Sequence, residues 1–150
     1  MNPTAPAVLP SALIAVLAVI AGLHAYWGFG GRWPGHDEAS CAGLVIGKTP
    51  GGRMPPPWAC FAVSAALAVG TLLVIDVSFG SHGLVPFDLI RSAYGVFAGV
   101  FLLRGAAGYV PVLWRPSAQT PFFTLNRRYY SPLCLVLGAG LALNLFAHKL

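Results

Sequence analysis

Long apolar stretches alternate with shorter polar segments along the whole chain. Four of the apolar stretches lie at 8–30, 58–79, 89–113 and 129–148. About 20 helical residues cross the hydrocarbon core of a bilayer, so each stretch is long enough to span it. None alternates as a barrel strand does, and unpaired backbone cannot persist in lipid, so all four are predicted to be helices. The pattern predicts an all-α fold, an integral membrane antiparallel four-helix bundle, with a single transmembrane domain over residues 1–150.

The composition indicates that lipid surrounds this chain. Hydrophobic residues make up 57% of its 150 residues and charged residues 9%, which leaves too few polar side chains to cover a water-soluble globule. The formal net charge is +5, but the nine Lys and Arg residues are scattered and never form a run longer than two. This distribution argues against nucleic acid as a partner and favours membrane lipids with anionic headgroups.

The basic residues are divided unequally between the two sides of the predicted bundle. The first and third connecting segments carry Arg32, Lys48, Arg53, Arg115, Arg127 and Arg128, whereas the opposite side carries Arg91 and Lys149. Because segments rich in Lys and Arg stay in the cytoplasm, both chain termini are predicted to lie outside it. The first stretch has no Lys or Arg before it and no cleavage pattern, so we expect an uncleaved span.

Two polar stretches predict where helices start. In residues 35–47, Asp37 is placed to cap a short helix at the membrane interface, although a disordered loop fits this segment equally well. In the stretch YYSPLC, Pro132 suits the first turn of the fourth helix, where the amide hydrogen that it lacks would have no partner. Ser131 is then expected to cap that turn.

Small residues recur at four-residue spacing, which lets helix backbones approach closely in lipid. The three series are Ala18 and Gly22, then Ala62, Ala66 and Gly70, then Gly95 and Gly99. They predict seams inside the bundle. The alternative is a homodimer interface, for which Gly95 and Gly99 are the best candidates.

No residue pattern assigns a reaction. Cys41, Cys60 and Cys134 form no C-x-x-C pair and no zinc-binding spacing, and on the predicted topology they lie at or near the reducing side. This weighs against a quinone-coupled thiol oxidoreductase and favours three small buried side chains. Phosphate-loop, H-E-x-x-H and G-x-S-x-G motifs are absent. The catalytic residues and any cofactor stay unknown, and no metal site is predicted.

Two motifs carry a resemblance to a known family. HAYWGFGGRWP follows the first apolar stretch, and PFFTLNRRYYSPLCLVLGAGL leads into the fourth. With the span pattern of nearly the whole chain, they resemble domain-of-unknown-function family 3995, which consists of small bacterial four-helix membrane proteins. The resemblance implies location in the bacterial inner (cytoplasmic) membrane and no established activity. It also implies acidic residues at two positions where this chain has Gly108 and Asn126, which argues against a carboxylate-based mechanism.

His24 and Arg104 define the candidate site. At a rise of about 1.5 Å per residue, they lie about 10 Å and about 15 Å below the same membrane boundary. Arg104 is the only arginine well inside a predicted span, where a guanidinium needs a partner or water. We expect a pocket between the first, third and fourth spans that holds an anionic or polar headgroup. Its candidate ligand-binding residues are His24, Tyr26, Trp27, Arg104, Tyr130, Ser131 and Cys134.

Other partners for Arg104 stay open at this point. They include backbone carbonyls, the hydroxyls of Tyr26 and Tyr130, and the first-loop acids Asp37 and Glu38. Asp76 lies roughly 12 Å away along the membrane normal and is too far for easy contact. The competing interpretation is that Arg104 extends to the interface and His24 bonds a neighbouring helix.

Three functions fit these residues. The first is binding or transport of an anionic or amphipathic small molecule or lipid, through a polar pocket in the cytoplasmic leaflet. The second is a membrane enzyme acting on a lipid or quinone, with His24 exchanging a proton. The third is an accessory or structural subunit of a membrane complex, in which buried polar residues only fix helix register. We take the first as the leading hypothesis, and leave open whether the protein is an enzyme.

Overall fold

All regular secondary structure in the described part of the chain is helical. A computed structural model describes residues 7–80 and 86–147. The long helices are α1 (Val8–Gly28), α3 (Pro57–Phe79), α4 (Phe87–Ala107) and α6 (Ser131–Ala147). They are connected by α2 (Glu38–Val45), α5 (Pro121–Leu125), the 3-10 turns η1 (Pro50–Gly52) and η2 (Pro111–Ser117), and the π-helical turn η3 (Asn126–Tyr130). These described residues contain no strand, so the predicted all-α class is confirmed.

Within residues 7–80 and 86–147, four helical segments are long and apolar enough to cross a membrane. They are Val8–Gly28, Pro57–Phe79, Asp88–Ala107 and Pro121–Ala147. The first two agree with the predicted stretches 8–30 and 58–79 to within two residues. This arrangement fits the small four-helix membrane protein that the apolar pattern predicts.

The third long helix ends earlier than the predicted stretch 89–113. α4 stops at Ala107, and Val110 has extended backbone angles (φ −91°, ψ 99°) directly before Pro111. Proline lacks an N–H group and disfavours helical backbone in the residue that precedes it. The chain therefore leaves the helix here and forms the η2 turn in place of a continued span.

The fourth span begins earlier than the predicted stretch 129–148. Pro121 opens α5, and the helix continues through η3 into α6. Ser131 lies inside this run with helical angles (φ −69°, ψ −45°), so its predicted role as an N-cap is wrong. Because Pro132 has no N–H to continue the helical ladder, the turn before it widens, and Ser131 N–H donates to the carbonyl of Asn126, five residues back.

Asp37 caps α2, as predicted. Its carboxylate accepts a hydrogen bond from Ser40 N–H at 2.7 Å, and Ser40 Oγ accepts one from Asp37 N–H at 3.1 Å. The hydrogen bonds from Ser40 hold the pKa of the Asp37 carboxyl below its ordinary value. The short helix predicted in residues 35–47 therefore forms, rather than the alternative disordered loop.

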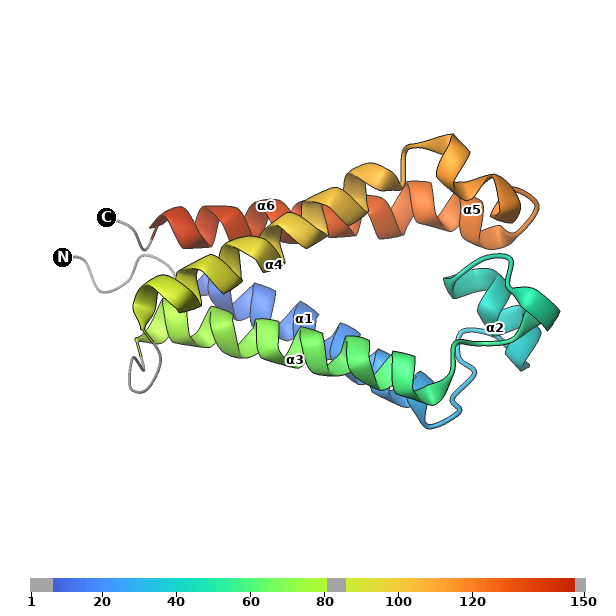
Figure 1. Cartoon of the computed structure of the whole chain (residues 1–150), viewed down its shortest axis with the longest axis horizontal. Coiled ribbons are helices and arrows are strands. Elements are labelled where there is room, and N and C mark those ends of the chain that lie inside the picture. Colours follow the sequence, from blue (N-terminus) through green and yellow to red (C-terminus); the bar gives the residue numbers. More distant parts are fainter. Residues whose placement is uncertain (1–6, 81–85, 148–150) are drawn as a thin grey trace.

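The four long helices are arranged as two antiparallel pairs. α1 packs mainly against α3, and α4 packs mainly against α6 (Figure 1). We call the end that contains Val8 and Ala147 the terminal end, and the opposite end, which carries α2 and α5, the loop end. The pairs share an apolar core and separate toward the loop end (Figure 1). The fully buried members of this core are Leu17, Val74, Tyr94 and Leu141.

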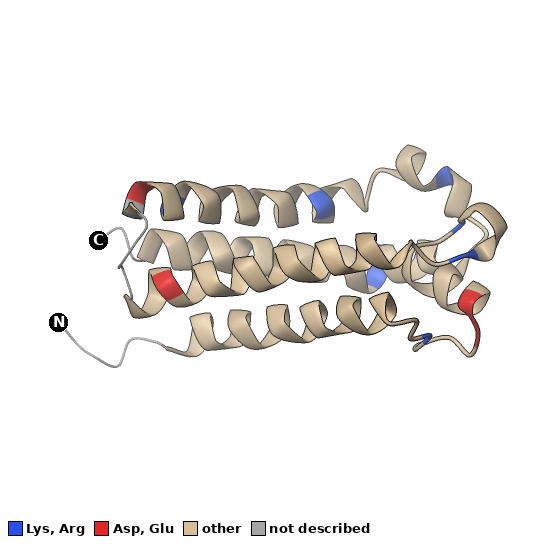
Figure 2. Cartoon of the chain, turned by 60° about the horizontal axis from the view of Figure 1, so that its bottom comes forward, with Lys and Arg blue, Asp and Glu red and all other residues tan. Residues whose placement is uncertain are grey.

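Basic residues are concentrated at the loop end. Figure 2 shows most of the described Lys and Arg positions there, in the segments next to α2 and α5, and few at the terminal end. The spatial arrangement therefore keeps the asymmetry that was counted along the sequence, because the first and third connecting segments meet at one end of the molecule.

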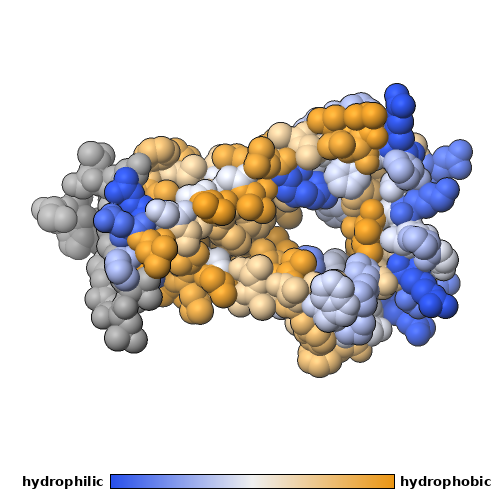
Figure 3. Space-filling model, in the orientation of Figure 1, coloured by the Kyte–Doolittle hydropathy of each residue, from blue (hydrophilic) through white to orange (hydrophobic). Residues whose placement is uncertain are grey.

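A buried polar cluster joins the pairs near the terminal end. Nδ2 of Asn144 in α6 donates to Ser78 Oγ of α3 at 3.0 Å and to Tyr94 OH of α4 at 2.9 Å. Asn144 is 2% exposed and Tyr94 is fully buried. Toward the loop end, by contrast, the molecule is hollowed between the pairs (Figure 3). The pairs are thus held together at one end and apart at the other.

Only part of the predicted glycine seams forms. A Cβ built on Gly70 would overlap the ring of Phe97, so Gly70 lies in a seam between α3 and α4 as predicted. The buried face of α1 runs through Leu17 and Ala21, one position away from the predicted series. The seam predicted for the other members of the first two series is therefore wrong, since these residues are exposed: Ala18, Gly22, Ala62 and Ala66.

The third series lies on a more open surface. Gly95 and Gly99 are half-buried, and a Cβ on Gly99 would meet no atom within 4 Å. A homodimer through Gly95 and Gly99 stays a prediction.

Candidate functional site

Arg104 lies in the last turn of α4 and is half-buried. Its Nη2 donates to Oδ1 of Asn126 at 2.9 Å, and its guanidinium carbon lies 5.0 Å from the ring centroid of Trp114. The indole is itself fixed, because Nε1 of Trp114 donates to the carbonyl of Ala107 at 2.7 Å. The guanidinium is therefore held by a neutral amide and an aromatic face.

The two acids of the first loop, Asp37 and Glu38, bond to other groups and not to Arg104. Asp37 caps α2, and Oε1 of Glu38 accepts a hydrogen bond from Met54 N–H at 3.0 Å. Among the residues that the structure describes, no carboxylate forms an ion pair with Arg104. Asn126 fills this place, at a position where the family resemblance implies an acid.

Asn126 and Ser131 complete the cluster around Arg104. Asn126 is 1% exposed and Ser131 is fully buried. Oδ1 of Asn126 accepts a second, longer hydrogen bond from Ser131 Oγ at 3.4 Å. The π-helical turn separates the two residues by five positions and places both side chains on the side of Arg104. Sequence reasoning named Ser131 as a candidate for a different reason and did not include Asn126.

Two buried donors in this cluster have no hydrogen-bond partner among the described residues. They are Nη1 of Arg104 and Nδ2 of Asn126. Both groups only donate, so the site lacks an acceptor. A buried donor without an acceptor costs about 1–3 kcal/mol, and more when it is charged. The cluster therefore offers an acceptor one positive charge and two NH₂ groups without a partner among the described residues.

Gly108 allows this cluster to close. A Cβ built on Gly108 would overlap Oγ of Ser131, and would lie 3.2 Å from Nδ2 of Asn126. Any larger residue at position 108 would displace the serine hydroxyl. The two positions at which the resemblance implies acids, 108 and 126, thus lie together beside Arg104.

His24 has its described contacts within its own helix. Nδ1 of His24 donates to the carbonyl of Ile20 at 2.8 Å, and the imidazole packs edge-on against Trp27 with ring centroids 5.1 Å apart. In the described part of the chain, no hydrogen bond or ring contact joins His24 to Arg104. Their shared pocket between α1, α4 and α6 stays a prediction.

Tyr26 and Trp27 hold the turn that follows α1. The hydroxyl of Tyr26 accepts hydrogen bonds from the backbone N–H groups of Arg32 and Trp33, both at 3.3 Å. Nε1 of Trp27 donates to the carbonyl of Trp33 at 2.7 Å. Gly30 has a positive φ of 87°, which suits glycine at this turn. These two candidate site residues therefore have a clear structural role.

Tyr130 and Cys134 lie on either side of Ser131 along the fourth span. The hydroxyl of Tyr130 donates to the carbonyl of Leu44 in α2 at 3.2 Å, and its ring packs 6.0 Å from that of Phe122. Cys134 is a half-buried free thiol one turn after Ser131. Tyr130 thus connects the start of the fourth span to α2.

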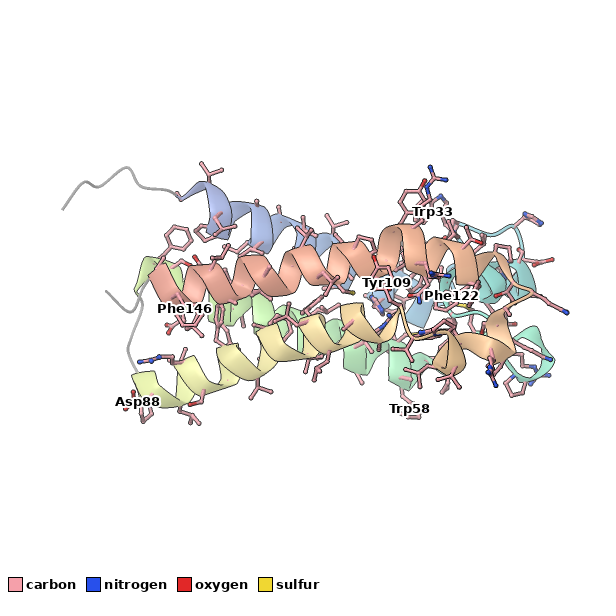
Figure 4. All side chains as sticks on the ribbon, turned by 90° about the horizontal axis from the view of Figure 1, so that it is seen from above. Trp33, Trp58, Asp88, Tyr109, Phe122 and Phe146 are labelled. Atoms are coloured by element: carbon pink, nitrogen blue, oxygen red, sulfur yellow. The ribbon has the colours of Figure 1, made fainter. Side chains whose placement is uncertain are left out.

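A shallow surface depression is lined by residues that neighbour Gly108 and Asn126 in the sequence. It measures about 370 Å³ and is lined by Tyr109, Phe123, Thr124, Arg127 and Arg128. The guanidinium carbon of Arg127 lies 6.0 Å from the ring centroid of Phe123. Figure 4 shows Tyr109 and Phe122 at the loop end with Trp33 and Trp58, and Asp88 and Phe146 at the terminal end. The basic and aromatic side chains of the loop end match those of a membrane interface.

The comparisons with known proteins agree with the resemblance seen in the motifs. Comparison with curated proteins and with solved structures found no match. Residues 17–141 match the family described as Protein of unknown function (DUF3995). This interval contains His24, Arg104, Asn126 and Ser131. Because the match covers well over half of the chain, the protein belongs to the DUF3995 family of unknown function.

Proposed function

We propose that the protein binds an anionic small molecule or lipid headgroup at Arg104, inside the membrane. The observation that carries this proposal is the neutral partner of Arg104: a guanidinium within a membrane-spanning segment bonds an amide, not a carboxylate. Ionisable residues in such segments are costly and usually serve a function. A positive charge without an internal counter-ion calls for an anion.

The missing acceptor could be an anion or a water molecule, and the positive charge of Arg104 favours the anion. One water could accept hydrogen bonds from Nη1 of Arg104 and Nδ2 of Asn126, but it would not balance the charge. A carboxylate or phosphate brings negative charge together with two or more acceptor oxygens. The two free donors belong to one hydrogen-bonded pair, so a single small anionic group suits both.

The orientation of the molecule is a further part of the proposal. We place the loop end at the cytoplasmic face of a bacterial inner membrane, with both termini outside, because Lys and Arg are concentrated at the loop end (Figure 2). Arg104 then lies in the cytoplasmic leaflet, which carries anionic lipids. The protein is thus proposed to be a binding or transport module for an anionic or amphipathic compound of that leaflet.

Co-purification tests this function. Wild type, Arg104→Gln and Arg91→Gln would be extracted in a non-ionic detergent, and bound anionic compounds identified by mass spectrometry. Arg91→Gln is the matched control, because it removes the same charge from the other end of α4. We expect wild type and the control to retain an anionic compound and Arg104→Gln to lose it. Equal retention by all three proteins would refute the proposal.

A further inference from the structure

The hollow between the helix pairs is closed at one end and open to the surrounding lipid along its side. Figure 1 shows the pairs separating toward the loop end, and Figure 3 shows the opening between them. At the terminal end, Asn144 joins α6 to Ser78 of α3 and Tyr94 of α4. The opening therefore lies on the loop-end side of this cluster (Figure 3), and the last turn of α4, which carries Arg104, lies toward the same end.

α2 and the residues that follow it cover the loop end of the hollow from the α4/α6 side. Tyr130 OH donates to the carbonyl of Leu44 at 3.2 Å, and Lys48 N–H donates to Ser117 Oγ at 2.9 Å. Gly47, with a φ of 100°, lies against the same serine so closely that a Cβ would overlap its hydroxyl. These contacts hold the C-terminal end of α2 against η2 and η3, in the segment that connects α4 to α6.

The same helix is also attached to the α1/α3 side. Glu38 Oε1 accepts a hydrogen bond from the N–H of Met54, which lies shortly before α3. Cys41 is fully buried, and its Sγ donates to the carbonyl of Trp33 at 3.7 Å. α2 thus bonds to the segments that follow α1 and precede α3, and it lies at the loop end of the molecule (Figure 1).

We infer that the ligand of Arg104 is an amphiphile that enters sideways from the bilayer. Its anionic head binds Arg104 and Asn126, and its hydrocarbon chain stays in the opening between the α1/α3 pair and the α4/α6 pair. This inference rests on the proposed anion-binding function. A small anion without a chain would have to lose its hydration to pass α2 or the apolar side. An amphiphile already has its chain in the bilayer, so only its head moves.

The experiment uses the whole protein in nanodiscs of phosphatidylcholine that contain a minor share of phosphatidic acid. The phosphatidic acid carries a photoactivatable group in its acyl chain, and a phosphatidylcholine probe with the same chain is the control for charge. Wild type, Arg104→Gln and Asn126→Asp would be irradiated with and without excess inorganic phosphate, and labelled peptides mapped by mass spectrometry. Asn126→Asp keeps the shape of the side chain and supplies Arg104 with an internal counter-ion.

The inference predicts that phosphatidic acid labels both helix pairs of wild type, and that excess inorganic phosphate leaves the labelling unchanged. Both variants lose this labelling, and the phosphatidylcholine probe gives none of it. If inorganic phosphate suppresses the labelling and itself binds wild type but not Arg104→Gln, sideways entry is wrong and anion binding stands. If neither phosphatidic acid nor inorganic phosphate distinguishes wild type from the variants, the proposed function fails as well.

Discussion

Arg104 and Asn126 form a hydrogen bond between side chains that are 22 residues apart in the sequence, with Nη2 to Oδ1 at 2.9 Å. The bond connects the last turn of α4 to the π-helical turn that leads into α6. Because Oδ1 of Asn126 also accepts from Ser131, the amide nitrogen of Asn126 points away from both donors. The orientation of this one amide therefore determines that the site is rich in donors.

Asn126→Asp should stabilise the protein and abolish anion binding. The substitution turns a neutral partner of Arg104 into a charged one, and hydrogen bonds to charged groups contribute about 1.5–3 kcal/mol, compared with about 1 kcal/mol for neutral pairs. Thermal unfolding in detergent measures the first effect, and retention of the anionic compound measures the second. Asn126→Ala is the control, which should lose stability. An Asn126→Asp protein that is more stable and still binds the anion would contradict the proposed site.

Gly108→Ala should destabilise the protein by about 1–3 kcal/mol, as overpacking does in a tight interior. The added methyl group overlaps Ser131 Oγ, which must then move away from Asn126. Gly99→Ala, within α4, is the control, because a Cβ there meets no atom within 4 Å. Alanine also favours helix over glycine by about 1 kcal/mol, so the control should unfold at the same or a higher temperature. Equal melting temperatures for the two variants would show that the contact at Gly108 is not tight.

Asn144→Leu should weaken the junction of the helix pairs at the terminal end. It removes the donor to Ser78 and Tyr94, and hydrogen bonds between membrane helices contribute about 0.6 kcal/mol each, at most about 1.7 kcal/mol. A lower melting temperature in detergent is the expected result. Leu143→Ala, at a neighbouring exposed position, should leave the melting temperature nearly unchanged. If Asn144→Leu left the melting temperature as unchanged as Leu143→Ala does, the junction would depend on contacts other than those of Asn144.

The stabilisation of α2 by its Asp37 cap should be lost in acid and should be unaffected by a rise in pH. The folded protein holds the pKa of Asp37 below its ordinary value of 3.8, so the stabilising effect is present above that value and is lost as the pH falls through the lowered pKa. Hydrogen exchange of the α2 amides should therefore accelerate, relative to the other helices, in strongly acidic solution. Asn is also a good N-cap but does not titrate, so Asp37→Asn should remove this acid dependence. If the exchange of the α2 amides accelerated equally in acid for wild type and Asp37→Asn, a group other than Asp37 would cause the acid dependence.

The orientation predicted from the basic residues has a direct test. A reporter that is active only outside the cytoplasm should work when it is fused after Leu150 and fail when it is inserted near Lys48. Six Lys and Arg residues in the connecting segments of the loop end underlie this expectation. The reverse result would place the loop end outside, and Arg104 in the other leaflet.

The spans could be predicted because hydropathy depends on composition over about 20 residues, which tolerates local irregularity. The ends of the third and fourth spans could not, because they depend on single residues. Pro111 and Pro121 each follow an extended residue and open a new helical segment, so the third span ends before Pro111 and the fourth begins at Pro121. Ser131 was expected to start a helix that in fact begins ten residues earlier.

The candidate site was found only in part, for a related reason. Arg104 stands out as an arginine within an apolar stretch, but Asn126 is followed by Arg127 and Arg128 and has the sequence context of a loop. Its burial depends on the π-helical turn, which tertiary packing and Pro132 impose together. A usable signal was the five-residue spacing of Asn126 and Ser131 directly before a proline. Asn144, with two polar partners in other helices, gave no signal because a lone amide in an apolar stretch names no partner.

The position of Trp114 makes the site visible to spectroscopy. Its indole lies 5.0 Å from the guanidinium carbon of Arg104, and its N–H is fixed to the carbonyl of Ala107. The emission energy of an indole depends on the electric field across its ring, so a negative group arriving at Arg104 changes the colour of this fluorescence. The other tryptophans, Trp27, Trp33 and Trp58, lie in or next to the α1/α3 pair and can be replaced without touching α4. A single native fluorophore can then report occupancy of the site in an intact bilayer, without any attached label.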